Sequence, residues 1–471
     1  MSPWPSLFNL ITLALVVTIG LPSASGSALE KVVLQAQCDN PMELAVLPDG
    51  RVLFVERFGK VRIWKPDTGK TVVAAEIPVH GNVNAIIAGQ QDRGSWESGL
   101  LGVTLAPEFS ETGWIYLYYS PKGDVSENRL SRFVLNGDML DLASEKIVLR
   151  VPVQRDVCCH EAGSLAMDGE GNLFLSTGDN TNPFQSDGFN PTDHRPGRYP
   201  FDASRSSGNA NDLRGKILRI HPEREGSYTI PKGNLFPPGT PHTRPEIFVM
   251  GCRNPFRITV DRVTGTLSWG EVGPDAREAK AERGPAGFDE LNRTRTAGNF
   301  GWPFLIADNK SYRQYDFATG TSGPAQDPAH PINRSPLNTG PQDLPEGRPA
   351  WIFYPYTPSA RFPAVGSGGR TACAGPFYRF DPGLASTRKL PETFDQSQLI
   401  YDWERRWILA VTVNPDGSAG AMRRVAPEME LKRPIEMELG PDGALYLIEF
   451  GSGWENNKDA QLVRIQAGTV R

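Results

Sequence analysis

A histidine and an aspartate stand at the two ends of one predicted hairpin. His160 lies near the start of the segment CCHEAGSLAMDGEGNLFLSTGDN, and Asp179 lies near its end. The residues between them form two apolar stretches around a Gly-containing turn, which is typical of two antiparallel strands. Because the two ends of a hairpin lie side by side, we expect the imidazole and the carboxylate to meet. Such a pair can accept a proton from a bound molecule near neutral pH.

Two adjacent cysteines, Cys158 and Cys159, precede this histidine. The chain has 5 cysteines, which are too few for a disulfide scaffold of this size and leave at least one without an intrachain partner. Three states are open for Cys159: a bond to Cys158, a bond to Cys252, and a free thiol.

Composition favours β structure and points away from two classes of partner. The 471 residues include 48 Gly and 41 Pro, and no long stretch keeps a helical period. The net charge is −5, without a concentrated acidic or basic run. We therefore expect neither nucleic acid nor an anionic membrane surface as a partner.

The first 26 residues are predicted to be a secretory signal peptide. An apolar run over 7–21 is followed by the small residues Ala24 and Gly26, a cleavage pattern. An N-terminal membrane anchor is the alternative, but this run is shorter than the ~20 residues that a spanning helix needs. We expect a mature chain over 27–471 that is secreted or periplasmic, without a membrane span.

A phrase of two apolar alternations around a turn recurs along the chain, which predicts an all-β, six-bladed β-propeller. Radial repetition of four-stranded sheets protects the strand edges, and two β-sandwich domains are the alternative. Two segments rich in Gly, Pro and polar residues, 180–214 and 303–350, are expected to be ordered functional loops over one face rather than strands. The six copies of the phrase lie at 42–56, 100–120, 163–179, 256–273, 375–413 and 435–451.

Eight short phrases together resemble a known family. ESGLLGVTLAPEF, CCHEAGSLA, STGDN, RGKILRI, GCRNPF, EVGPD, GNFGWP and GPDGALYL occur in the order seen in soluble quinoprotein glucose/sorbosone dehydrogenases. The resemblance spans roughly residues 40–467. These relatives are six-bladed propellers that depend on pyrroloquinoline quinone (PQQ). The resemblance implies an enzyme that oxidises a sugar or a related alcohol by hydride transfer to PQQ.

The resemblance also assigns catalytic roles. It makes His160 the base that removes the hydroxyl proton, and Asp179 the carboxylate that orients His160. Arg253, in GCRNPF, resembles the arginine that holds the quinone oxygen and stabilises the negative charge that develops there. Asn254 is the neighbouring donor. An arginine that only caps a turn is the alternative for Arg253.

Further basic residues align with the positions that bind the carboxylates of the cofactor. Arg405 stands at the position of a lysine, and Arg433 stands at the first of two arginine positions. The second position is Ile435. The contact missing at Ile435 is either lost or supplied by another cation, Arg370 or Arg406.

Calcium is the second cofactor that the resemblance implies. Gly273 and Pro274, in EVGPD, resemble the pair whose backbone carbonyls hold Ca²⁺ against the cofactor, where its charge would polarise the quinone. Asp289 and Glu290, in FDELN, resemble a second, structural calcium cluster. A plain turn and a solvated acidic pair are the alternatives.

The predicted sugar pocket differs from that of the best-known family members. Cys159 stands where they have an aspartate, and Glu97 stands where a glutamine contacts sugar. A tryptophan of their pocket aligns with the glycine run around Gly368. We therefore predict that Glu97 and Cys159 contact the substrate, and we expect a sorbosone, aldose or pyranose type of substrate rather than assuming glucose.

The reaction also needs a partner for its electrons. The chain lacks the CxxCH signal of covalent haem, so an external cytochrome, cupredoxin or small quinone is implied. A homodimer is left open. Two other functions compete: a secreted binding propeller related to hedgehog-interacting proteins, favoured by Arg405 and Ile435, and a calcium-dependent lactonase-like hydrolase, which would need more acidic and amide residues at the channel.

Overall fold

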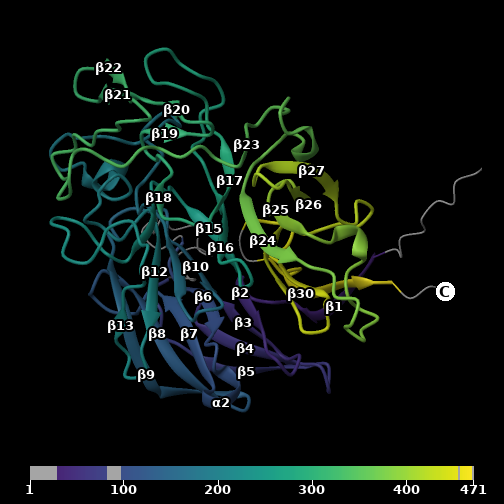
Figure 1. The fold of residues 1–471 in the computed structure, drawn as a ribbon. Coiled ribbons are helices and arrows are strands. Elements are labelled where there is room, and N and C mark those ends of the chain that lie inside the picture. The colour runs from purple at the N-terminus through teal and green to yellow at the C-terminus, as the bar shows by residue number, and fades with distance from the viewer. Residues whose placement is uncertain (1–28, 82–96, 455–456, 469–471) are drawn as a thin grey trace, which may run out of the picture.

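The structure is a computed structural model that describes residues 29–81, 97–454 and 457–468. These residues form a six-bladed β-propeller (Figure 1). The segment predicted as a signal peptide lies outside the described residues. Within them, no helix is long and apolar enough to cross a membrane.

Each blade is an antiparallel sheet whose first strand lies nearest the axis. The first three blades contain β2 (Pro41–Val46), β3 (Val52–Glu56), β4 (Lys60–Lys65) and β5 (Lys70–Glu76); β6 (Leu100–Leu105), β7 (Trp114–Tyr119), β8 (Glu127–Asn136) and β9 (Met139–Pro152); and β10 (Ala162–Met167), β11 (Leu173–Thr177), β12 (Lys216–Pro222) and β14 (Ile247–Met250). Two short strands extend the third blade: β13 (Tyr228–Thr229) pairs with β12, and β18 (Gly298–Asn299) runs parallel to β14.

The remaining three blades close the ring. They contain β15 (Pro255–Asp261), β16 (Thr266–Glu271), β17 (Asp289–Thr294) and β23 (Ile352–Tyr354); β24 (Ala372–Tyr378), β25 (Ser397–Asp402), β26 (Trp407–Val413) and β27 (Ala419–Arg424); and β28 (Pro434–Leu439), β29 (Leu445–Glu449), β30 (Gln461–Ala467) and β1 (Leu29–Ala36). Because β1 pairs with β30 from Leu29↔Ala467 to Ala36↔Gln461, the two ends of the chain complete one blade. The six innermost strands β2, β6, β10, β15, β24 and β28 each contact the next around the ring.

The six-bladed prediction is confirmed, and each predicted repeat falls on the inner strands of one blade. The inner strands are apolar on both faces because neighbouring blades cover them: every residue of β2 and of β3 is buried. The only α-helix in the described ranges is the single turn α2 (Phe109–Thr112). Four 3₁₀ turns accompany it: η2 (Tyr199–Phe201), η3 (Ala203–Arg205), η4 (Pro363–Val365) and η5 (Glu392–Phe394).

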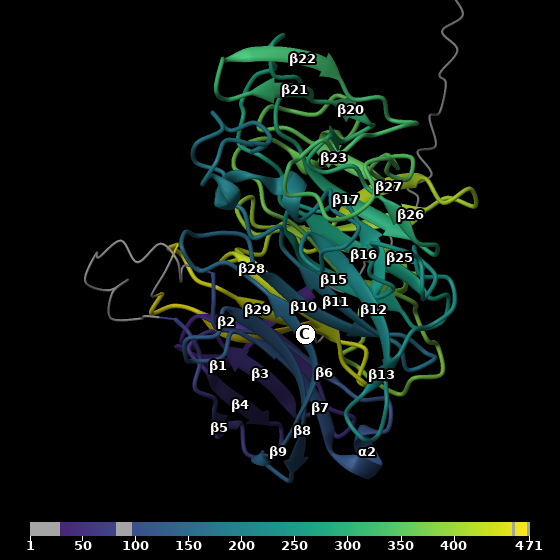
Figure 2. The same cartoon turned by 90° about the vertical axis from the view of Figure 1, so that its left-hand side faces the viewer.

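The two predicted long loops pack against each other over one end of the propeller. The amide of Asn333 donates to the carbonyls of Ser204 (2.8 Å) and Gly208 (2.9 Å), which ties the second loop to the first. The expectation that 303–350 lacks strands is wrong, because tight turns close two small hairpins there. These are β19 (Leu305–Ile306) with β20 (Lys310–Ser311), and β21 (Arg313–Asp316) with β22 (Thr321–Ala325). Figures 1 and 2 both show β20–β22 beyond the blades at this end.

A fully buried arginine connects blades at the axis. Arg257, on β15, has its Nε 2.9 Å from a carboxylate oxygen of Glu436 on β28. Its Nη2 donates to the carbonyl of Met42 on β2 (2.6 Å). Since a buried charge is costly unless it is paired and hydrogen-bonded, these contacts fix the relative positions of three innermost strands.

Glu43, the neighbour of Met42, extends this cluster to two more strands. Its carboxylate accepts the amide of Val103 on β6 (2.7 Å) and the hydroxyl of Ser164 on β10 (2.5 Å). Burial raises the pKa of Glu43 to about 7, against the effect of Arg257. Burial, reinforced by Glu43, raises the pKa of Glu436 well above its usual range. These upward shifts of the two pKa values favour a proton on the pair in the folded protein.

Replacing Glu436 by Gln is expected to flatten the pH dependence of stability. A carboxyl whose pKa is raised by folding contributes stability that is complete below the usual pKa of glutamate and is lost as the pH rises toward the folded value. Between pH 5 and 8 the wild type should therefore lose at least about 1 kcal/mol more than Glu436→Gln. Chemical denaturation across this range measures the difference. Parallel curves for the two proteins would show that Glu436 is not shifted.

Candidate active site

The predicted site residues lie at one mouth of the propeller because of the strand order. All innermost strands run in the same direction along the axis, so the residues that precede them gather at one end, and the ends of the second strands join them there. Before an innermost strand lie Glu97, Cys159, His160, Arg253, Asn254, Arg370 and Arg433, and after a second strand lie Asp179, Gly273, Pro274 and Arg405. Asp289 and Glu290 begin the third strand of their blade, β17.

The predicted base and its carboxylate are in direct contact. Nδ1 of His160 lies 2.8 Å from Oδ1 of Asp179, and both side chains are buried. Asp179 Oδ1 also accepts the amide of Thr181 (3.0 Å), and Oδ2 accepts Nε1 of Trp302 (2.9 Å). With donors on both oxygens, Asp179 is an acceptor, so the Nδ1 of His160 carries the hydrogen and Nε2 is left to accept a proton.

Trp302 was not predicted as a site residue. It lies in the phrase GNFGWP, and its peptide bond to Pro303 is cis. Its partner Asp179 is 123 positions away in the chain. The one signal in the sequence was a tryptophan next to a proline in a family-like phrase, which says nothing about the side chain that it contacts.

Backbone contacts hold the pair in place. The amide of Asp179 donates to the carbonyl of Arg253 (2.8 Å), and the amide of Asn180 donates to the carbonyl of His160 (3.1 Å). A Cβ atom on Gly178 would lie 2.2 Å from that same carbonyl of His160. The glycine before Asp179 is therefore required by the close approach of the two chain segments.

Arg253 and Asn254 lie beside the pair and hold unused polar atoms. Both backbone amides donate to Oε1 of Glu271, at 2.8 and 2.5 Å, and Nη1 of Arg253 donates to the carbonyl of Val272 (2.9 Å). Nε of Arg253 and Oδ1 of Asn254 are buried without a hydrogen-bond partner. Buried polar atoms are rarely left so in proteins, and a bound polar ligand would satisfy them.

Two buried carboxyls lie under this region. Glu271 and Glu290 face each other across β16 and β17. Burial raises the pKa of Glu271 to about 8, with a further rise from Glu290, and burial raises the pKa of Glu290 to about 7. Glu290 accepts the amide of Ala307 (2.5 Å) and the side-chain amide of Asn292 (3.1 Å). The predicted calcium ligand Glu290 thus already has two protein donors.

Arg370 contacts two other residues that were predicted to bind calcium, Pro274 and Asp289. Its Nη2 donates to the carbonyl of Pro274 (2.7 Å), and its Nη1 lies 3.1 Å from Oδ1 of Asp289. Asp289 also accepts the amides of Gly273 (3.1 Å) and Ala372 (2.9 Å). In the described part of the chain, no three His, Cys, Asp or Glu side chains are grouped to hold a metal ion. The residues present do not fit Ca²⁺ in this arrangement.

The other two predicted cofactor arginines are bound to the protein itself. Each guanidinium nitrogen of Arg405 donates to backbone carbonyls, among them those of Gly369 (2.7 Å) and Pro355 (2.6 Å). Arg433 pairs with Glu404 (3.2 Å) and lies 4.7 Å from the ring of Trp403. Cofactor binding by Arg405 and Arg433 stays a prediction.

The two predicted substrate residues flank His160. Cys159 forms a disulfide with Cys158, while Cys252 is buried and free, so of the three states considered the structure has the bond between neighbours. Glu97 accepts the amide of Glu161, the residue after His160, at 2.9 Å. Both residues therefore lie at the mouth, and their contact with a substrate stays a prediction.

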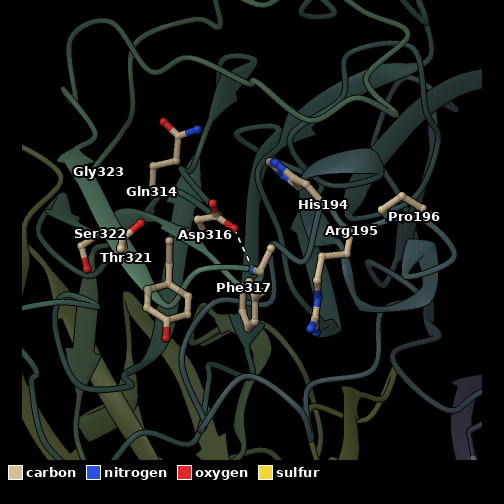
Figure 3. Close-up of a pocket in the computed structure, with 11 residues that line it drawn as sticks. His194, Arg195, Pro196, Gln314, Asp316, Phe317, Thr321, Ser322 and Gly323 are labelled. Carbon is tan, nitrogen blue, oxygen red and sulfur yellow. Dashed lines mark hydrogen bonds between the residues drawn. The ribbon is translucent and has the colours of Figure 1, made fainter.

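A cavity of about 620 Å³ lies away from this cluster. Figure 3 shows its lining, with His194 and Arg195 from the first long loop on one side and Phe317 from the β21–β22 hairpin on the other. None of the predicted site residues lines it. Because the mouth around His160 holds the buried imidazole–carboxylate pair and the unsatisfied atoms of Arg253 and Asn254, we take that mouth rather than the cavity as the candidate site.

Known proteins resemble this chain in both sequence and fold. The chain is 29% identical over 277 residues to aldose sugar dehydrogenase YliI of Escherichia coli, an alignment that covers 58% of this chain and 61% of that protein. It is 24% identical over 340 residues to quinoprotein glucose dehydrogenase B of Acinetobacter calcoaceticus, covering 68% of this chain and 64% of that protein. The chain thus spans less than two thirds of the length of these relatives.

Solved structures share the fold. The soluble aldose sugar dehydrogenase of E. coli in its apo-form matches with a TM-score of 0.59 and 21% identity, over 93% of this chain and 100% of that chain. The PQQ-bound aldose sugar dehydrogenase of Streptomyces coelicolor matches with a TM-score of 0.56 and 17% identity, over 93% and 98%. The family profile described as glucose/sorbosone dehydrogenase matches residues 38–340, which is more than half of the sequence. The chain belongs to the glucose/sorbosone dehydrogenase family.

Proposed function

We propose that the protein is a PQQ-dependent dehydrogenase that oxidises a hydroxyl group of a sugar or related alcohol. The observation that carries the proposal is the buried contact between His160 and Asp179, with Arg253 beside it. The family and the printed activities of its relatives, aldose sugar dehydrogenase and quinoprotein glucose dehydrogenase, support the same chemistry.

The donor set at the mouth suits PQQ. The cofactor carries three carboxylates and two quinone oxygens, which call for guanidinium and amide groups. Arg253 would hold it through its unsatisfied Nε–H, with Asn254 as the predicted neighbouring donor, and Arg433 is the predicted partner of a carboxylate. When bound, PQQ would supply the electrophilic carbon that accepts a hydride, a group that amino-acid side chains do not offer.

The residues of the chain would handle the proton and the charge. Nε2 of His160 would accept the proton of the substrate hydroxyl, because Nδ1–H is already directed to Asp179. Asp179 would stabilise the imidazolium that forms, and Trp302 would keep the carboxylate oriented. The positive charge of Arg253 would stabilise negative charge that develops beside it, and burial strengthens that effect by excluding water.

The finer parts of the proposal concern substrate, export and electron acceptor. Glu97 and Cys159 would shape a pocket for an aldose-like or pyranose-like substrate, without glucose being assumed. The reduced cofactor would pass its electrons to an external cytochrome, cupredoxin or quinone. Export to the periplasm or outside the cell rests on the pattern over 1–26.

A non-catalytic binding propeller is the alternative that the first experiment separates. Human hedgehog-interacting protein is 24% identical over 227 residues, covering 45% of this chain. A pure binding surface has no need of a buried imidazole paired with a carboxylate, so the contact between His160 and Asp179 favours the enzyme. The hydrolase alternative has no supporting metal-binding cluster among the described residues.

Asp179→Asn should lower kcat by roughly 10²- to 10⁴-fold while leaving PQQ affinity nearly unchanged. Asparagine offers one acceptor oxygen, so it cannot accept from both His160 and Trp302 as the carboxylate does. Steady-state kinetics at saturating cofactor and a separate cofactor titration measure the two quantities. Asp124→Asn, at an exposed aspartate, is the matched control. An unchanged kcat in Asp179→Asn would remove His160 from the role of base.

Reconstitution tests the function itself. Purified apoprotein is mixed with PQQ and Ca²⁺, and dye reduction is followed across a panel of sugars, with His160→Ala as the comparison. We expect reduction that requires PQQ and that falls to background in His160→Ala, although this variant still binds PQQ. If the wild type fails to bind PQQ, the binding propeller becomes the better hypothesis.

A further inference from the structure

We propose that Arg370 is the built-in cation of the cofactor site, in the place of a calcium ion, so that PQQ binds without a divalent metal. The inference rests on the proposed function and departs from the calcium site that the family resemblance implies. If Arg370 supplies the positive charge, the protein needs no calcium ion from the solution to bind PQQ.

The contact with Pro274 carries the inference. A calcium ion bound here would need the carbonyl oxygen of Pro274, and Nη2 of Arg370 donates to that oxygen at 2.7 Å. A guanidinium and a divalent cation on one carbonyl would repel each other. The Arg370 side chain is 1% exposed, so its guanidinium is enclosed by the protein next to Pro274.

Asp289 is already paired with a cation in this arrangement. Its Oδ1 faces Nη1 of Arg370 (3.1 Å) and accepts the amide of Gly273 (3.1 Å), while its Oδ2 accepts the amide of Ala372 (2.9 Å). A metal ion on this carboxylate would lie against the Arg370 guanidinium and would be repelled by it. The guanidinium of Arg370 therefore neutralises the carboxylate of Asp289, which a calcium ion would otherwise do.

The surroundings of Arg370 are fitted to its guanidinium. The group lies 4.0 Å from the ring centre of Tyr356, a cation–π contact. A Cβ atom on Gly287 would approach Nη2 to 3.1 Å and would lie 1.6 Å from the carbonyl oxygen of Pro274. A side chain at position 287 would therefore displace both partners of the central hydrogen bond.

The guanidinium of Arg370 keeps N–H groups that no protein atom accepts, so they are available to a ligand. Nε and Nη1 of Arg370 are buried without a hydrogen-bond partner, as is Nε of Arg253. Both arginines precede the innermost strand of their blade, Arg253 before β15 and Arg370 before β24, and these two strands contact each other. Two guanidinium groups with unsatisfied N–H groups on adjacent blades suit a ligand with several anionic oxygens, as PQQ is. Arg370 would also replace the cation missing at Ile435.

The wild-type protein gives the first test. PQQ binding is measured by equilibrium dialysis on metal-stripped protein, once with EGTA and once with millimolar Ca²⁺. A guanidinium is covalently part of the chain and cannot be removed by a chelator, so we expect the two dissociation constants to agree within about twofold. Binding that appears only with Ca²⁺ would overturn this inference and leave the proposed function intact. Absence of binding in both conditions would overturn both.

Variants of Arg370 give the second test, again with binding as the readout. In EGTA, Arg370→Gln should weaken PQQ binding by at least about tenfold, and Arg370→Lys should recover part of the loss because it keeps the charge. Arg361→Gln, at an exposed arginine nine positions earlier, is the matched control and should bind as the wild type does. Equal affinity in Arg370→Gln and the wild type would overturn the inference. If Arg370→Gln does not fold, the chelator comparison on the wild type decides.

Discussion

The site depends on the way in which the innermost strands are held in register around the axis. Arg257, in the fourth blade, is fully buried, and its guanidinium must be paired. It contacts Glu436 in the sixth blade and the carbonyl of Met42 in the first blade. Glu43 carries the same network to two more strands. Because these strands cannot slide independently, the residues that precede them keep fixed positions at one mouth. The proposed catalytic pair is thus positioned by a cluster that takes no part in the proposed chemistry.

The buried acids at the mouth fall into two groups according to their surroundings. Asp179 accepts three hydrogen bonds, and Asp289 is paired with Arg370. Glu271 and Glu290 face each other, and burial raises their pKa values to about 8 and about 7. These raised pKa values lessen the negative charge that the two glutamates place near the arginines. Such an environment would favour the anionic cofactor that we propose.

Short sequence patterns predicted those parts of the structure that form between residues close together in the chain. The six repeats marked the inner strands because apolar alternation around a turn is a short-range pattern, and the hairpin ends correctly brought His160 to Asp179. Trp302 was missed because its partner is 123 positions away. The small hairpins within 303–350 were missed because their strands are too short and too polar to show a period.

The calcium site shows a different limit of sequence reasoning. Pro274 would bind a metal through a backbone carbonyl, which every residue has, so the phrase EVGPD reports the turn and not the ion. Whether the carbonyl is free depends on Arg370, 96 positions away. A sequence can thus retain the turn whose backbone carbonyls would bind a metal ion, while a distant side chain supplies the positive charge instead. If Arg370 is the cation of the cofactor site, the sequence signal for that charge is this arginine, two residues before β24, and not the turn itself.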